Sequence, residues 1–298
     1  MRTSWRMLLL AGCFAACSAA GLAQGQPVEV QVPSLDAPGG RVLVLRGFWF
    51  AAPATVSGPG PAPAMLLLHG CGGMFDRQGR PALRYTELAQ RLGALGVHAL
   101  ALDSLGARGE REFCTQPIGQ RAITQQQRRR DVLGALQWLA VQAGVDAQRL
   151  GVLGWSHGGS AALAALNKRH PEVAAAGVQP SLAVAFYPGC STELQRGFTA
   201  QAPLLMLLGE ADDWTPAAPC KRLAESAAQA QEGPVPQWES YAGAYHGFDG
   251  TDVVRLRSDV PNGVHRGQGV HVGTDPAARA AAALRLDAFL RMHWALKP

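Results

Sequence analysis

The stretch LGVLGWSHGGSAA, residues 150–162, determines how the rest of the chain is interpreted. It contains Gly154-Trp155-Ser156-His157-Gly158, a G-x-S-x-G motif. An apolar run of strand type leads into the motif, and small helix-forming residues follow it. A sharp strand-to-helix turn of this kind strains the serine backbone and exposes its hydroxyl, and the glycines avoid clashes with the neighbouring strand and helix. The stretch therefore predicts that Ser156 is a nucleophile at the end of a buried strand.

Short apolar runs alternate with helix-period segments on both sides of this motif. Eight strands are predicted, at Val28–Val32, Arg41–Phe50, Ala64–His69, Val97–Asp103, Arg149–Trp155, Leu182–Tyr187, Pro203–Leu208 and Gln237–Tyr241. Helices are predicted at Pro81–Leu95, Arg121–Ala143, His157–His170, Pro216–Gln231 and Asp275–Trp294. Several strands are apolar on both faces, which is typical of strands covered by helices on both sides. We therefore expect one α/β domain over residues 24–298, with a mostly parallel, doubly wound sheet of about eight strands flanked by helices.

The composition excludes several classes of protein. With 298 residues, 48% hydrophobic and 16% charged, the chain is neither disordered nor collagen-like. The formal net charge is +5, and it falls to +3 without the two arginines of residues 1–23 (25 basic minus 22 acidic). This small, dispersed excess does not indicate nucleic-acid binding. The run Arg128-Arg129-Arg130 is interpreted as a solvent-exposed helix face.

The first residues resemble an export signal. Two arginines precede an apolar or small stretch, Met7–Ala20, and Gly21-Leu22-Ala23 provides a cleavage site of A-x-A type. We expect residues 1–23 to be a signal peptide and the protein to be periplasmic or secreted. The stretch is shorter than the ~20 residues that span a bilayer, and no later run is long enough, so no transmembrane segment is expected. Lipoprotein anchoring at Cys13 or Cys17 remains an alternative to soluble export.

A serine nucleophile needs a base, and the base needs an orienting carboxylate. With a turn of this type the chain order is serine, acid, histidine. The segment GEADDWTP (209–216) follows one strand, and YHGFD (245–249) follows the next. Both segments are expected at the carboxyl edge of a parallel sheet, where such sites form. The candidate acids are Asp212 and Asp213, and the candidate base is His246.

An oxyanion intermediate also needs two backbone N–H donors. The residue after the nucleophile, His157, can supply one of them. The loop HGCGG (69–73), which follows an earlier strand, can supply the second. Its glycines allow the backbone to approach a substrate closely.

Together, HGCGG, GWSHGG, GEADDWTP and YHGFD resemble the dienelactone hydrolase family of α/β-hydrolases, over about residues 40–296. The resemblance implies the α/β-hydrolase fold, with Ser156 as nucleophile, Asp212 as acid and His246 as base. It also implies that the backbone N–H groups of Cys71 and His157 form the oxyanion hole. Asp212 is preferred to its neighbour because it lies three residues after a glycine, as in the family's G-x-x-D.

Two positions depart from the family's type enzyme. That enzyme has a cysteine where this chain has Ser156, and a glutamate where this chain has Gly70. Dienelactone is therefore not expected as the substrate. The resemblance implies a hydrolase that cleaves small-molecule carboxylic esters through an acyl-enzyme and needs no cofactor. The predicted signal peptide makes it an exported enzyme, and no metal is expected. A short-peptide or amide hydrolase, or a non-catalytic scaffold that binds ligands, remain alternatives, and the oligomeric state is left open.

Three residues are candidates for the substrate pocket. Trp155 and Trp214 flank the predicted nucleophile and acid, so either can form a pocket wall. Arg108 lies in the loop after a predicted strand and is a candidate ligand for an anionic substrate group.

Four cysteines follow the predicted signal peptide, at Cys71, Cys114, Cys190 and Cys220. An even number favours disulfides in an oxidising compartment, and the spacing fits no zinc site. Cys71 and Cys114 follow strands expected to be neighbours, and the same holds for Cys190 and Cys220. We therefore predict the bridges Cys71–Cys114 and Cys190–Cys220, with four buried thiols as the alternative.

Overall fold

The central sheet of the computed structural model, which describes residues 26–297, has the strand order β1-β2-β4-β3-β5-β6-β7-β8. The strands are β1 (Val28–Pro33), β2 (Val44–Phe50), β3 (Ala62–Leu68), β4 (His98–Asp103), β5 (Val145–Trp155), β6 (Leu182–Phe186), β7 (Leu204–Gly209) and β8 (Gln237–Tyr241). β2 pairs antiparallel with β1 and β4, and the other neighbours are parallel. The predicted sheet, mostly parallel with eight strands, is confirmed.

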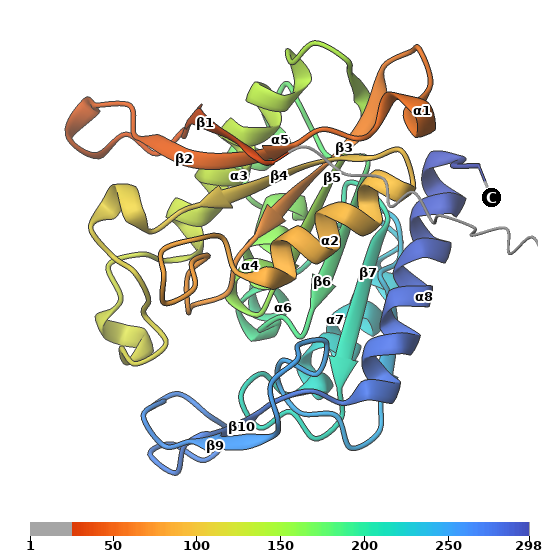
Figure 1. The fold of residues 1–298 in the computed structure, drawn as a ribbon. Coiled ribbons are helices and arrows are strands. Elements are labelled where there is room, and N and C mark those ends of the chain that lie inside the picture. Colours follow the sequence, from red (N-terminus) through yellow and green to blue (C-terminus); the bar gives the residue numbers. More distant parts are fainter. Residues whose placement is uncertain (1–25, 298) are drawn as a thin grey trace, which may run out of the picture.

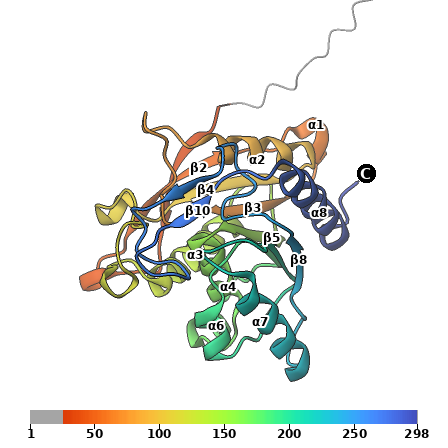
Figure 2. The same ribbon diagram turned by 90° about the horizontal axis from the view of Figure 1, so that it is seen from below.

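Helices cover both faces of this sheet (Figures 1 and 2). α2 (Leu83–Ala94) and α8 (Pro276–Trp294) cover one face, and α3 (Gln125–Ala140), α4 (His157–Leu166) and α7 (Ala217–Ala230) cover the other. Three short helices lie in connections: α1 (Ala54–Ser57), α5 (Pro171–Ala174) and α6 (Ser191–Arg196). Successive β3 residues alternate between the two cores, with Leu66 packing in the α3 core and Leu67 in the α2 core. This double burial explains why the central strands are apolar throughout.

The helices keep their predicted positions, with shorter ends. α3 begins after Thr124, whose side chain accepts a hydrogen bond from the Gln126 N–H and forms a capping box with Gln127. α4 ends at Leu166 because the chain turns at Asn167, four residues before Pro171. α6 was not predicted, and neither was the small hairpin of β9 (Arg255–Arg257) and β10 (Val270–Val272). The residues from 250 to 273, which include this hairpin, are called the strap below.

The interpretation of the arginine run as a solvated face was wrong. Arg128 is completely buried, and Arg129 is 8% exposed. Arg130 is partly exposed and pairs with Asp36 and Glu172. α3 packs against the sheet and alongside α4, so Arg128 and Arg129 in its first turns are buried in these contacts rather than exposed to water.

The predicted signal peptide lies outside the described residues, as do Cys13 and Cys17. Among the helices that the structure describes, none is both long and apolar enough to cross a bilayer. The described chain begins just before β1, at the edge of the sheet opposite β8.

Candidate active site

Ser156 occupies the sharp turn between β5 and α4. Its backbone has φ 54° and ψ −118°, which a non-glycine residue adopts only under strain. A Cβ at Gly154 would lie 2.2 Å from the Gly158 carbonyl oxygen, and one at Gly158 would lie 2.2 Å from the Leu68 carbonyl oxygen. Both glycines are therefore required by close backbone contacts, as the motif predicted. The turn places Ser156 at the N-terminus of α4, where the helix dipole favours negative charge.

Ser156, His246 and Asp212 form a continuous hydrogen-bonded chain. The Ser156 Oγ lies 2.9 Å from His246 Nε2, and His246 Nδ1 lies 2.8 Å from Asp212 Oδ2. A carboxylate can only accept here, so Nδ1 carries the proton and Nε2 is free to accept from the serine. The three residues are 8%, 5% and 4% exposed, so little water competes for these bonds.

The Asp212 carboxylate is fixed by the turn that follows it. Its Oδ1 accepts hydrogen bonds from the Trp214 and Thr215 N–H groups, both at 2.8 Å. Thr215 Oγ1 lies 3.1 Å from Asp212 Oδ2 and 3.0 Å from His246 Nδ1. Thr215 was not predicted, although the spacing Asp-x-x-Thr before α7 is a turn signal that could have indicated it.

The neighbouring acid, Asp213, is directed away from His246. Its Oδ2 pairs with His271 Nδ1 at 2.7 Å, and its Oδ1 accepts the His271 N–H at 2.8 Å. Asp213 therefore holds β10 of the strap. The geometry brings Asp212, and not Asp213, to the base.

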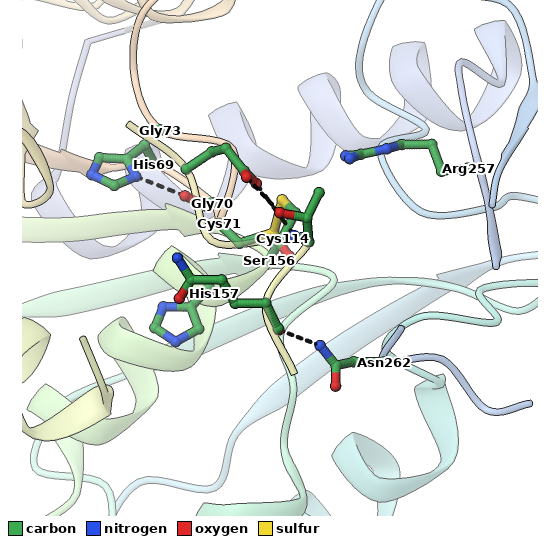
Figure 3. Close-up of a disulfide and its surroundings, with 12 residues drawn as sticks. His69, Gly70, Cys71, Gly73, Cys114, Ser156, His157, Arg257 and Asn262 are labelled. Atoms are coloured by element: carbon green, nitrogen blue, oxygen red, sulfur yellow. Dashed lines mark hydrogen bonds between the residues drawn. A yellow bond between two sulfur atoms is a disulfide. The ribbon is translucent and has the colours of Figure 1, made fainter. Parts of the chain in front are cut away.

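In the loop predicted to carry an oxyanion donor, the Gly70 and Cys71 carbonyl groups accept hydrogen bonds, the first of which Figure 3 shows. His69 Nδ1 donates to the Gly70 oxygen at 2.7 Å, and Ser104 N–H donates to His69 Nε2 at 3.1 Å. The Cys71 oxygen accepts the Phe113 N–H at 2.9 Å. Because a trans peptide directs N–H opposite to C=O, the bond to the Gly70 oxygen fixes the direction of the Cys71 N–H.

The structure contains both predicted disulfides. Cys71 is linked to Cys114, and Cys190 is linked to Cys220. Figure 3 shows the first bridge beside Ser156. It ties the HGCGG loop after β3 to the loop after the neighbouring strand β4.

The two histidines next to the site are held in their neutral form. Burial, and then the nearby charge of Arg128, lower the pKa of His69 well below its ordinary value. The same causes, in the same order, lower the pKa of His157. Both side chains therefore remain uncharged at neutral pH, and neither is bonded to Ser156. His157 instead packs its ring against Phe113, with the ring centroids 4.7 Å apart.

Ser156 lies between two cavities, of about 530 Å³ and 640 Å³, and lines both. Cys71 and Trp214 also line both cavities, so they form the ridge between them. The smaller cavity extends toward Ser191 and Thr192 of α6. The larger cavity extends toward α2 and β9. A substrate with groups on either side of a reacting carbonyl can occupy both.

The larger cavity has a polar wall behind the base. Trp155 Nε1 donates to Asp249 at 2.7 Å, and the Tyr187 hydroxyl donates to the same carboxylate at 2.6 Å. Arg84 donates to the Tyr187 oxygen at 2.8 Å. The Tyr187 ring packs on one side of His246 and the Trp214 ring on another, each with its centroid 4.6 Å from that of the imidazole. Trp155 and Trp214 both line the larger cavity.

Arg108 does not lie in either cavity beside Ser156, which corrects its assignment as a pocket residue. Its guanidinium pairs with Asp36 at 2.8 Å and with Asp131 at 2.9 Å. Asp36 precedes Arg108 by 72 residues, and no local pattern indicated this partner.

The strap lines both cavities beside Ser156, with Asn262 in the smaller one and Arg255 and Arg257 in the larger one. Asn262 donates to the Gln116 oxygen at 2.8 Å and accepts the Ile118 N–H at 3.0 Å. The Arg257 guanidinium carbon lies 5.8 Å from the centroid of the Trp214 ring. Neither contact could be predicted from a local pattern, because both join segments that are distant in the chain.

The model of the dienelactone hydrolase family matches residues 51–291. The chain belongs to the dienelactone hydrolase family. Among curated proteins, the uncharacterized protein Rv2307c of Mycobacterium tuberculosis is 30% identical over 229 residues, which are 68% of this chain and 73% of the relative. Membership of the family indicates a hydrolase that acts on esters.

Solved structures share the α/β-hydrolase fold of this family member. Esterase 2 of Thermogutta terrifontis, in the form phosphorylated by paraoxon, has a TM-score of 0.64 at 18% identity, covering 92% of this chain and 97% of that chain. A Klebsiella pneumoniae protein, provisionally described as a dienelactone hydrolase, has a TM-score of 0.61 at 17% identity, covering 89% and 99%.

Proposed function

We propose that the protein is an exported serine hydrolase of carboxylic esters that works through an acyl-enzyme formed on Ser156. The observation that carries this proposal is the unbroken chain from Ser156 Oγ through His246 to Asp212, with bonds of 2.9 Å and 2.8 Å. Such a chain delivers a base to a serine and an acid to the base. Family membership supports ester chemistry, and the two disulfides support an oxidising destination.

In the proposed reaction the Ser156 oxygen attacks the ester carbonyl while His246 Nε2 removes its proton. The carbonyl oxygen becomes an oxyanion, which the N–H groups of Cys71 and His157 stabilise, each contributing about 3–4 kcal/mol in comparable sites. His246 then returns the proton to the departing alcohol. Water, activated by the same imidazole, releases the acid from Ser156. Asp212 keeps the Nδ1 proton in place throughout.

The two cavities suggest how an ester is placed. With Ser156 on the ridge, the acyl group occupies one cavity and the alcohol the other. The Thermogutta terrifontis esterase 2 has been solved with propionate and with butyrate bound. Short acyl groups are therefore the first substrates to examine.

A panel of p-nitrophenyl esters graded by acyl length tests the proposal directly. We expect turnover of short esters that is unaffected by EDTA, and a loss of several orders of magnitude in Ser156→Ala and in His246→Ala, because the triad acts as a unit. A matched anilide series separates esterase from amidase. Equal turnover by wild type and Ser156→Ala would exclude the serine mechanism.

A further inference from the structure

Arg128 is a buried cation that forms no salt bridge with a carboxylate of the described residues, although Asp131 lies close enough to act on its charge. Its side chain is completely buried in α3, and burial lowers its pKa to about 10, so it remains charged at neutral pH. Its Nε and Nη2 have no hydrogen-bond partner among the described residues. The adjacent acid, Asp131, accepts two bonds from Arg108 and one from Ser34 instead. A buried charge without an ion-pair partner lowers the free energy of unfolding. Proteins keep such unfavourable groups mainly at functional sites.

The contacts that Arg128 does make lead to the proposed oxyanion hole. Its Nη1 donates to the His69 carbonyl at 2.7 Å, and the same nitrogen lies 3.5 Å from His157 Nδ1. One turn earlier on α3, Gln125 donates to the His157 carbonyl at 3.3 Å. The first turns of α3 therefore hold both segments that carry the oxyanion donors, the loop after β3 and the start of α4.

Arg128 is too deeply buried to touch a substrate. It lines neither cavity beside Ser156, whereas its neighbours Gln125 and Arg129 line the smaller one. Any effect on the reaction must therefore act through the backbone that it holds and through its field, which little water screens at this depth.

We propose that Arg128 is the positioning residue of the oxyanion hole: it holds the loop that carries Cys71 through the His69 carbonyl, and its unpaired charge strengthens the Cys71 and His157 N–H groups as donors to the oxyanion. This inference rests on the proposed function. It predicts that loss of Arg128 weakens the stabilisation of the transition state while leaving substrate binding intact.

The experiment compares wild type with Arg128→Met, Arg128→Lys and Arg128→Gln. Methionine has similar length and no charge, lysine keeps the charge, and glutamine keeps a donor without the charge. Arg130→Met is the matched control, because Arg130 is on the same helix and pairs with Asp36 and Glu172 near the surface. Thermal unfolding of each variant reports the folded fraction.

Two rates are measured on folded protein. The first is kcat with its KM on p-nitrophenyl butyrate. The second is the rate at which a fluorophosphonate modifies Ser156, followed by mass: the Ser156 Oγ–phosphorus bond forms, the phosphorus–fluorine bond breaks, fluoride leaves and His246 takes the proton. This second rate needs the oxyanion hole but no acyl turnover.

We expect Arg128→Met to lower kcat about 10- to 100-fold, with KM changed less than about threefold and the modification rate lowered by a similar factor. Arg128→Lys should recover most of the loss, Arg128→Gln should not, and Arg130→Met should stay within about twofold of wild type.

Wild-type rates in Arg128→Met, or a loss confined to KM, would overturn the inference. If Arg128→Met does not fold, the comparison of lysine with glutamine decides, and equal rates in those two variants overturn it. Failure of the fluorophosphonate to modify wild-type Ser156 would instead remove the proposed function, and this inference with it.

Discussion

Replacing Asp212 by asparagine tests the triad at the point where the structure allows a magnitude to be calculated. An asparagine must place its oxygen on one side and its amide NH₂ on the other. The Oδ1 position receives two backbone N–H donors, from Trp214 and Thr215, both at 2.8 Å. The oxygen is therefore held there, and the NH₂ group faces His246. An NH₂ group donates to Nδ1, so the imidazole proton moves to Nε2, and the base can no longer accept from Ser156.

The opposite orientation restores the correct tautomer but leaves two buried N–H groups facing an NH₂ group. Each unsatisfied buried donor costs about 1–3 kcal/mol, so the productive arrangement lies about 2–6 kcal/mol higher. At 1.36 kcal/mol per factor of ten, this corresponds to a loss of roughly 30- to 26,000-fold. We expect kcat of Asp212→Asn near the middle of this range, about 10³-fold below wild type, with little change in KM.

The assay is steady-state turnover of a chromogenic ester, with thermal unfolding as a check on folding. Asp213→Asn is the matched control, because Asp213 pairs with His271 and has no contact with His246. It should retain activity within a few-fold. If Asp213→Asn is crippling while Asp212→Asn stays within tenfold of wild type, the assignment of the acid is wrong.

Two further predictions concern the disulfides and the buried histidines around the HGCGG loop. Cys114→Ser should lower stability by about 4 kcal/mol, for a bridge that closes 43 residues, and should also lower kcat, because the Cys71 loop loses its tether. Cys220→Ser, whose bridge closes 30 residues in the other half of the sheet, should lose stability with much less effect on kcat; equal kcat losses would contradict a role in catalysis. The second prediction concerns pH, because burial first and Arg128 second hold the pKa of His69 and of His157 below the ~6.5 of an unfolded histidine. The unfolded state then binds more protons below that pH, so stability should be complete above about pH 6.5 and fall by roughly 1.4 kcal/mol per pH unit for each histidine as the pH decreases. A melting temperature that is constant from pH 7 to pH 5 would contradict this.

The sequence was sufficient for the sheet because the sheet depends on local pattern. Runs such as Met65–Leu68 are apolar on both faces, and this property follows directly from burial between two layers of helices. The strained turn at Ser156 was equally local, since the glycines that permit it lie within two residues.

The sequence was insufficient where a residue depends on distant partners. The rule that charged residues face water placed Arg128 on the surface, but its acceptor is the His69 carbonyl, 59 residues earlier. Arg108 was wrongly assigned to the pocket for a similar reason. Its partner Asp36 belongs to the segment after β1, which no local pattern connects with Arg108. Asn262 reaches across the site to bonds made with a loop 144 residues earlier.

Two segments of the site are therefore held in place in different ways. Ser156, the proposed nucleophile, is fixed by its own turn, and Asp212, the proposed acid, is fixed by the turn that follows it. The HGCGG loop, in contrast, contains glycines that impose little conformation of their own. Its conformation is instead held by contacts from other segments. The His69 carbonyl accepts a hydrogen bond from Arg128, the Cys71 carbonyl accepts one from the Phe113 N–H, and the Cys71 side chain is linked to Cys114 by a disulfide. Catalysis should therefore depend on Arg128 of α3 and on the Cys71–Cys114 bridge as well as on the residues that react, and substitutions of Arg128 or Cys114 should lower kcat while leaving Ser156, His246 and Asp212 in place.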